Sequence, residues 1–383
     1  MQLLAADIGT GTQDIYLYNS ELDLENNYKL ILPSPTMMVY MRVKEATSRK
    51  SPLVLSGVIM GGGPSQWAVQ AHLEAGLPVF STQEAAKSFN DDLEKVQEMG
   101  IKIVSPDEAA QLARKSGYTN ITLYDFDFFA IEQAFSIFGA SLNDLEAIAV
   151  GVFDHGNAPP DYSDRQFRFD YLDRVIRENN SLASFAYLAQ NIPSIMTRLK
   201  AVAQTSASLP AQLIVMDTAP AAALGALFDP LVRDTRPLIV TNVGNFHTIA
   251  FRLGGSGIEG VFEHHTGLID LQKLDSLLAS LANSTLRHVD VYNDQGHGAL
   301  VYDPNPIDIH SQPFGIVATG PRRSMLNQSI LHPHFAAPFG DMMISGCFGL
   351  LAAAAKLLPD QGEQILASLT GFGGSGTPPW EIY

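Results

Sequence analysis

The stretch LLAADIGTGTQDIYLY, residues 3–18, holds an aspartate and a run of Gly and Thr between two apolar segments. The segments on either side, residues 3–6 and 15–18, have the composition of short strands, and a Gly-rich run between two strands is typical of a hairpin turn. We therefore expect a β-hairpin at the start of the chain. The rest of the sequence is needed to decide whether its turn holds a ligand.

This turn has the composition of a phosphate-binding loop. Gly9 and Gly11 leave room for a phosphate against the backbone. Successive N–H groups in such a turn form an anion-binding nest, and Thr10 and Thr12 add hydroxyl donors. Asp7 repels phosphate directly, so its expected role is to hold Mg²⁺ through a water molecule. A glycine-rich hairpin without a ligand is the alternative.

Length, charge and cysteine content limit the classes of protein to consider. The 383 residues are 46% hydrophobic, which suggests two domains of about 100–200 residues each. A net charge of −16 argues against binding to nucleic acid or to an anionic membrane. The single cysteine, Cys347, excludes an internal disulfide and an iron–sulfur cluster held by cysteines of one chain. It also favours a cytoplasmic location.

Two further features argue against a signal peptide and a membrane-spanning helix. The first residues include Asp7 and no basic segment, unlike a signal peptide. The longest apolar stretch, Met342–Ala355, is shorter than the ~18 residues of a membrane-spanning helix. We expect a buried helix there.

The sequence pattern of residues 6–18 is repeated later in the chain. TNVGNFHTIAF, residues 241–251, has a polar residue, a Gly two positions later and a return strand, as ADIGTGTQDIYLY does. This repeated pattern predicts two similar α/β halves that meet at a cleft.

Between these loops, residues 37–43 (MMVYMRV) and 52–62 (PLVLSGVIMGG) are apolar enough to predict further strands. The glycines in MGGGPSQWAVQ, residues 60–70, precede a helical pattern. We interpret them as a loop after a strand that contacts substrate. An anion site at the helix N-terminus is the alternative.

Asp154 and His155 follow the predicted strand AIAVGVF. Open α/β folds bind ligands at the ends of their strands. Asp154 is therefore a candidate base that accepts a proton from a substrate hydroxyl, and His155 is the reserve candidate. The alternative is an Asx turn in which Asp154 binds its own backbone.

A histidine-rich segment, EHHTG, suggests a metal site. Alternate residues of a strand share a face, so Glu263 and His265 could bind one ion together, whereas His264 points the other way. His297, in DQGHGA, is the third candidate ligand. Polar histidines near a cleft, without a metal, are the alternative.

The motifs together resemble the actin, sugar-kinase and heat-shock-70 ATPase superfamily. DIGTGT resembles its first phosphate loop and NVGNFHT its second, which would contain Asn242, Gly244, Asn245 and Thr248. ATGPRRSML followed by SGCFGLLAAAA resembles its adenosine motif, which adds Thr319 and Gly320 to the site. GVFDHG resembles the segment that lies beside the substrate in sugar kinases. The resemblance implies two ribonuclease-H-like domains around a nucleotide cleft, residues 1–230 with insertions and residues 231–383.

The chain is similar, more closely, to a prokaryotic family labelled as a pyruvate formate-lyase activating protein. The landmarks DIGTGTQD, GVFDHG, MDTAPAAALGAL, NVGNFHTIAF, EHHTG, GHGA and ATGPRR cover most of its length. A radical-generating activase uses three cysteines in CxxxCxxC to hold its cluster, and this chain has one. We therefore expect no radical iron–sulfur chemistry.

The resemblance implies a function based on ATP and Mg²⁺. We expect phosphoryl transfer to a small hydroxylated molecule, or ATP hydrolysis. Asn242 stands where the superfamily has an acid, and Phe246 where it has a glycine, and both differences favour a non-catalytic nucleotide sensor as the alternative. A metal-dependent enzyme that uses Glu263, His265 and His297 is a further alternative. The expected partner is a small-molecule substrate, with no nucleic acid and no membrane, and self-association is left open.

Overall fold

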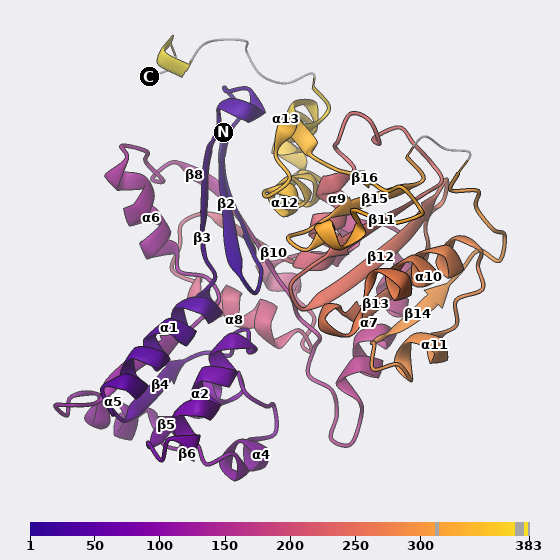
Figure 1. Ribbon diagram of the computed structural model, residues 1–383. Coiled ribbons are helices and arrows are strands. Elements are labelled where there is room, and N and C mark those ends of the chain that lie inside the picture. The colour runs from indigo at the N-terminus through magenta and orange to yellow at the C-terminus, as the bar shows by residue number, and fades with distance from the viewer. Residues whose placement is uncertain (311–313, 372–378, 382–383) are drawn as a thin grey trace.

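The computed structural model describes residues 1–310, 314–371 and 379–381, which form a mixed α/β structure with three β-sheets (Figure 1). Two sheets have six strands each, and the third has four. No helix within the described residues is both long and apolar enough to cross a lipid bilayer.

The first sheet contains the hairpin predicted at the start of the chain. Its strand order is β3-β2-β1-β8-β10-β9. Strands β3, β2 and β1 are antiparallel neighbours, and β8 and β10 continue the sheet parallel to β1. In chain order the strands are β1 (Gln2–Ile8), β2 (Thr12–Asn19), β3 (Tyr28–Pro33), β8 (Leu145–Val152), β9 (Ala186–Leu188) and β10 (Gln212–Asp217).

The second sheet repeats this arrangement in the later part of the chain. Its order is β14-β13-β12-β11-β15-β16. Strands β13, β12 and β11 are antiparallel neighbours, and β15 and β16 continue parallel to β11. The strands are β11 (Leu238–Val243), β12 (His247–Gly254), β13 (Gly257–His265), β14 (Gly298–Val301), β15 (Ile316–Thr319) and β16 (His334–Phe335).

The two first hairpins correspond residue by residue. The Gly9 N–H donates to the Thr12 carbonyl across the β1–β2 turn (2.9 Å), and the Gly244 N–H donates to the His247 carbonyl across the β11–β12 turn (3.0 Å). Asp7 therefore corresponds to Asn242. The similarity between the two sequence stretches thus corresponds to a repeated strand order in the two sheets. The domain boundary near residue 230 stays a prediction.

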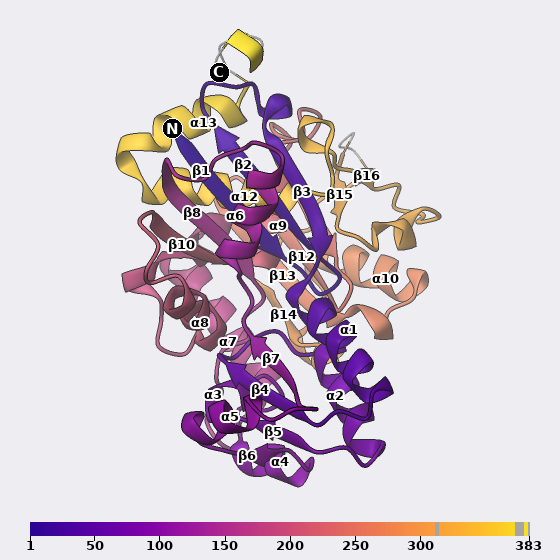
Figure 2. The same ribbon diagram turned by 90° about the vertical axis from the view of Figure 1, so that its left-hand side faces the viewer.

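The third sheet lies between β3 and β8 in sequence and has four parallel strands in the order β6-β5-β4-β7. It lies with its helices below the first sheet in Figure 2. Its strands are β4 (Leu53–Gly57), β5 (Val79–Ser81), β6 (Lys102–Ile103) and β7 (Thr119–Leu123). We call residues 34–127 the inserted layer. Its helices are α1 (Pro35–Ser48), α2 (Pro64–Glu74), α3 (Gln83–Ala86), α4 (Leu93–Glu98) and α5 (Pro106–Ala113).

The prediction of a strand at residues 37–43 is wrong, because this segment lies within α1. The Ser34 side chain caps the helix by accepting a hydrogen bond from the Met37 N–H (3.3 Å), and Pro35 occupies the first turn. A Ser-Pro start is a strong helix signal, and it outweighs the β-like composition of the apolar run that follows.

Two helices of small residues fill the space between the six-stranded sheets. Helix α12 (Ser345–Leu357) packs on the first sheet, and α9 (Thr218–Ala226) packs on β11 and β15. A Cβ on Gly349 would lie 1.9 Å from the Ala221 carbonyl oxygen, and one on Gly225 would lie 1.6 Å from that of Ser345. Glycine is therefore required for this close crossing. The buried helix predicted at Met342–Ala355 corresponds to α12.

Six further α-helices and seven short 3₁₀ turns complete the described part of the chain. The α-helices are α6 (Phe128–Ile137), α7 (Asp164–Glu178), α8 (Thr197–Thr205), α10 (Leu271–Ala282), α11 (His288–Tyr292) and α13 (Pro359–Leu369). Short 3₁₀ turns are η1 (Leu24–Asn26), η2 (Leu182–Phe185), η3 (Ala189–Asn191), η4 (Thr266–Leu268), η5 (Arg323–Leu326), η6 (Pro338–Gly340) and η7 (Pro379–Glu381).

Candidate functional site

A cleft of about 1090 Å³ lies where the two six-stranded sheets and the inserted layer meet. Both hairpin turns line it, together with the N-termini of α9 and α12 and the loops at residues 59–63 and 153–164. Most of the loop residues singled out in the sequence line this cleft: Asp7, Gly9, Thr10, Gly11, Thr12, Asn242, Gly244, Asn245, Thr319 and Gly320. The structure thus brings these distant segments together.

Two carboxyl groups lie side by side at the base of the first turn. Asp7 on β1 pairs in register with Asp14 on β2, and both line the cleft. Burial raises the pKa of Asp7 to about 7, although a hydrogen bond from the Thr218 hydroxyl opposes the shift. Burial, with a further contribution from the charge of Asp7, also raises the pKa of Asp14 to about 7. One oxygen of Asp14 is buried and has no hydrogen-bond partner among the described residues.

Asp7 is held by close packing as well as by Thr218. A Cβ on Gly346, in the first turn of α12, would lie 1.8 Å from an Asp7 carboxylate oxygen. A Cβ on Gly151 of β8 would lie 2.9 Å from the other oxygen. The two glycines therefore leave the space in which the Asp7 carboxyl sits. Asp14, Thr218 and Gly346 were not among the site residues predicted from the sequence.

The second turn meets the first at the cleft. A Cβ on Gly11 would lie 2.7 Å from the amide nitrogen of Asn245, so the tips of the two hairpins are in contact. Thr248 does not share this position. It is buried, and its hydroxyl is hydrogen-bonded to that of Thr266 (2.9 Å). The structure thus gives Thr248 a role in joining β12 to η4.

The predicted adenosine turn also lines the cleft. Gly320 has a φ of +97°, a conformation that side-chain-bearing residues rarely adopt. A Cβ there would lie 2.3 Å from the Asn242 side-chain oxygen. Asn242 therefore packs against the Gly320 turn.

Asp154 is not placed to act as a base. It is 1% exposed, and it does not line the cleft. One carboxylate oxygen accepts from the Gly156 N–H (2.9 Å) and the other from the Leu199 N–H (3.0 Å). This is the Asx turn considered as the alternative, here extended to the start of α8. His155, the reserve candidate, lines the cleft.

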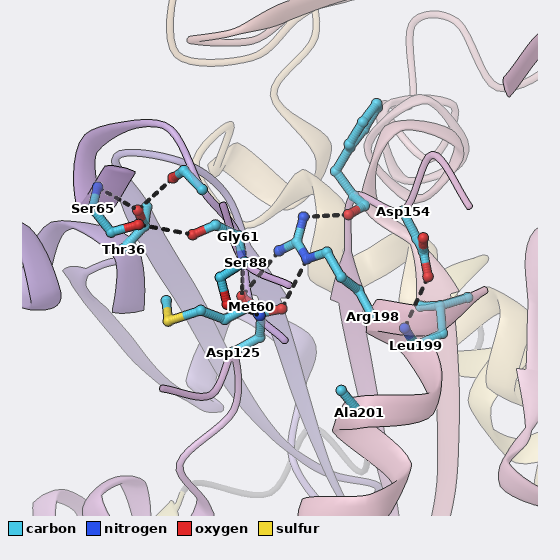
Figure 3. A network of polar contacts seen from close by, with 12 residues as sticks. Thr36, Met60, Gly61, Ser65, Ser88, Asp125, Asp154, Arg198, Leu199 and Ala201 are labelled. Atoms are coloured by element: carbon cyan, nitrogen blue, oxygen red, sulfur yellow. Dashed lines mark hydrogen bonds and ion pairs between the residues drawn. The ribbon is translucent and has the colours of Figure 1, made fainter. Parts of the chain in front are cut away.

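A polar network fixes the glycine loop of the inserted layer (Figure 3). Asp125 accepts two hydrogen bonds from the Arg198 guanidinium (2.9 Å each) and one from the Gly61 N–H (2.9 Å). Arg198 also donates to the Phe153 carbonyl, which ties the loop to the strand end before Asp154. Residues 59–63 line the cleft, as the interpretation of MGGGPSQWAVQ requires. Sequence reasoning missed Asp125 and Arg198, which lie far apart in the chain.

The histidine-rich segment gathers a different set of residues from the set predicted. His265 and His297 come together with His247, and Glu263 instead makes an ion pair with the buried Arg168 (3.1 Å). His247 could have been identified from the sequence, because its position after the second turn corresponds to that of Thr12 after the first.

Comparison with known proteins identifies the family. The profile of the family described as "Putative pyruvate format-lyase activating enzyme (DUF1786)" matches residues 60–325, and the chain belongs to this family. No curated protein matched. Among solved structures, the ethanolamine utilization protein EutJ from Carboxydothermus hydrogenoformans is similar at 11% identity and a TM-score of 0.32, over 91% of this chain and 89% of that one. An exopolyphosphatase-like protein is similar at 9% identity and a TM-score of 0.23, over 83% and 66%.

Proposed function

We propose that the chain binds Mg·ATP in this cleft, between two ribonuclease-H-like halves that meet near residue 230. The observation that carries the proposal is the pair of equivalent turns at Gly9 and Gly244, one from each six-stranded sheet, whose tips meet at one cleft. Glycine turns present backbone N–H groups to phosphate. The Gly320 turn offers a place for the adenosine.

The residues below the first turn fit a magnesium ion. Asp7 and Asp14 are oxygen ligands of the type that Mg²⁺ prefers. Their raised pKa values, and the unpartnered oxygen of Asp14, are what a cation-binding pair has without its cation. Mg²⁺ would neutralise the phosphate oxygens, while Asp7 and Asp14 would fix its position directly or through water.

The proposed reaction is phosphoryl transfer to a small hydroxylated molecule, or hydrolysis of ATP. The acceptor would lie between the glycine loop at residues 60–63 and the loop that carries His155, because both line the same cleft. His155 would accept the proton of the acceptor hydroxyl. Asp154 would instead hold the His155 loop, since both of its oxygens accept backbone hydrogen bonds.

A nucleotide sensor without turnover is the second candidate function. Asn242 favours it, because Asn242 corresponds to Asp7 yet carries no charge and packs on Gly320. The family description suggests a third activity, activation of pyruvate formate-lyase. The single cysteine, Cys347, is buried, and one cysteine cannot supply the three ligands of an activase cluster. We therefore do not propose radical chemistry.

Thermal unfolding tests nucleotide binding. A ligand that binds only the folded state stabilises it by about 2.7 kcal/mol at about one hundred times its Kd, so Mg·ATP or Mg·ADP should raise the Tm. Gly11→Val should abolish the rise, because its side chain would fill the space that the glycine turn leaves for phosphate. Gly255→Val is the matched control, since Gly255 has open space around its Cβ position. No rise in Tm with millimolar nucleotide would refute the proposal.

Phosphate release separates the two candidate functions. An enzyme should release phosphate from ATP, alone or with a panel of sugars, polyols and hydroxy acids. His155→Gln should lower that rate by about 10²–10⁴-fold, the usual contribution of a general base, without changing the nucleotide-induced rise in Tm. Binding without any release, by the parent protein, would favour the sensor.

A further inference from the structure

Three histidines converge beside the second turn. His247 begins β12, His265 ends β13, and His297 immediately precedes β14. His247 and His265 are register partners, and the His297 N–H donates to the Glu263 carbonyl (2.9 Å). Strand pairing therefore fixes all three positions. One ring nitrogen from each lies within 4.8 Å of those of the other two.

These rings lack the carboxylate partners that two other histidines of the chain have. His264 is bonded to Asp294 (3.1 Å), and His334 to Asp229 (2.9 Å). Within the described residues, no side-chain hydrogen bond involves the rings of His247, His265 or His297, and the Nδ1 atom of His297 is buried without a partner. Burying a polar atom without a hydrogen-bond partner is unfavourable, and a bound ligand would offset this cost.

The surroundings keep the rings neutral. Burial lowers the pKa of each ring, that of His297 to about 2, and the proximity of the rings to one another lowers the pKa of His247 and His297 further. Neutral imidazole is the form that binds a metal ion.

A carboxylate on the same strand as His265 adds a negative charge to this pocket. Glu263 is fully buried, and its charge is the largest electrostatic influence on His247 and His265. One guanidinium, that of Arg168, faces both Glu263 and Asp217, and the second oxygen of Glu263 has no partner among the described residues. A cation between the rings would balance this charge.

We propose that His247, His265 and His297 bind one divalent transition-metal ion, with zinc the best fit, whose open coordination position faces the cleft. His247 lines the cleft, and three protein ligands with one open position are the pattern of catalytic zinc sites. Zinc–nitrogen bonds of about 2.0–2.1 Å place ligand nitrogens roughly 3.3–3.4 Å apart, so the rings turn slightly inward on binding. The open position suits an anionic oxygen of a ligand in the cleft.

Metal titration of the full chain, without nucleotide, tests this site. After treatment with a chelator, the protein should bind one Zn²⁺ per chain by calorimetry. Co²⁺ should give the visible absorption of a four-coordinate ion, and excess Mg²⁺ should not displace it, since Mg²⁺ prefers oxygen ligands. Because nucleotide is absent, the result does not depend on the proposed ATP binding.

Two variants and a control locate the ion. His265→Ala, at a half-buried position, and His297→Gln should each weaken Zn²⁺ binding by at least about 100-fold. Loss of a residue that only hydrogen-bonds to a metal ligand already weakens binding by up to about 100-fold. His332→Asn, at an exposed loop position, should bind as the parent does. Circular dichroism would check that each variant is folded. Absence of stoichiometric binding, or binding at parental affinity in both folded variants, would overturn the proposal.

Discussion

At the scale of single residues, the paired carboxyl groups of Asp7 and Asp14 predict a pH dependence of stability. Their pKa values are about 7 in the folded chain, against 3.8 unperturbed, so the folded state holds these protons more tightly than the unfolded state. Their contribution to stability is fully present below about pH 4 and is lost as the pH rises through about 7.

Asp14→Asn isolates this effect, because asparagine stays neutral at every pH. We expect the variant to match the parent near pH 4 and to exceed its free energy of unfolding at pH 8, by at most about 4 kcal/mol at about 1.4 kcal/mol per pKa unit. Urea unfolding at both pH values measures this. Asp161→Asn, at an exposed position that also lines the cleft, is the control. Parallel pH profiles for Asp14→Asn and parent would contradict the assignment.

The site residues that lie in the turns were predicted from the sequence, whereas residues that lie next to these turns in the fold were not. Gly9, Gly244 and Gly320 were found because a tight turn has a local signature. Asp14 was missed because its neighbour Asp7 lies across a hairpin, a pairing that emerges only from strand register. Asp154 looked reactive because its two backbone donors cannot be read from composition.

At the scale of elements, the close crossing of α9 and α12 predicts that one added methyl group lowers the free energy of unfolding. Gly349→Ala would place a Cβ 1.9 Å from a backbone oxygen of α9, which cannot move aside as a flexible side chain could. We expect a loss of about 1–3 kcal/mol, as for other overpacked cores, measured as a lower urea midpoint with an unchanged slope. Gly255→Ala, which has open space, should change the free energy by less than about 0.5 kcal/mol.

The Asp125–Arg198 pair predicts the rigidity of the glycine loop. Asp125→Asn loses the charge that holds both Arg198 and the Gly61 N–H. We expect faster hydrogen exchange at residues 60–63, because their backbone loses its anchor. Glu84→Gln, which breaks an exposed ion pair with Lys87 in the same layer, should leave that exchange unchanged. Equal exchange rates in Asp125→Asn and parent would show that other contacts hold the loop.

Strand and helix patterns were predictable where the local signals agreed. The two loop hairpins and the small-residue helix were anticipated from alternation and composition. Residues 37–43 were not, because an apolar run can pack in either form and the capping Ser34 lies outside it. The register that aligns Gly9 with Gly244 required the folded chain.

At the scale of the whole molecule, Trp67 can report on the cleft. Trp67 on α2 is exposed, and its ring lies 5.4 Å from that of Phe246 in the second turn, so it joins the inserted layer to the second sheet. The other tryptophan, Trp380, is also exposed. In the Trp380→Phe variant, Trp67 is the single tryptophan. Mg·ATP bound beside the second turn should therefore shift its fluorescence emission. Phe246→Ala in the same background should remove most of that shift. Emission that stays constant while the Tm rises would mean that binding leaves this contact unchanged.

The buried Arg168 restricts how the chain can be divided. It lies on α7, its partner Asp217 ends a strand of the first sheet, and Glu263 belongs to the second. A fragment that stopped at the predicted boundary would keep Asp217 and lose Glu263, and the complementary fragment would carry a buried acid with no cation. Neither piece should be obtained folded by itself. A protease cut near the exposed Asp234 should instead yield two polypeptides that elute together on gel filtration.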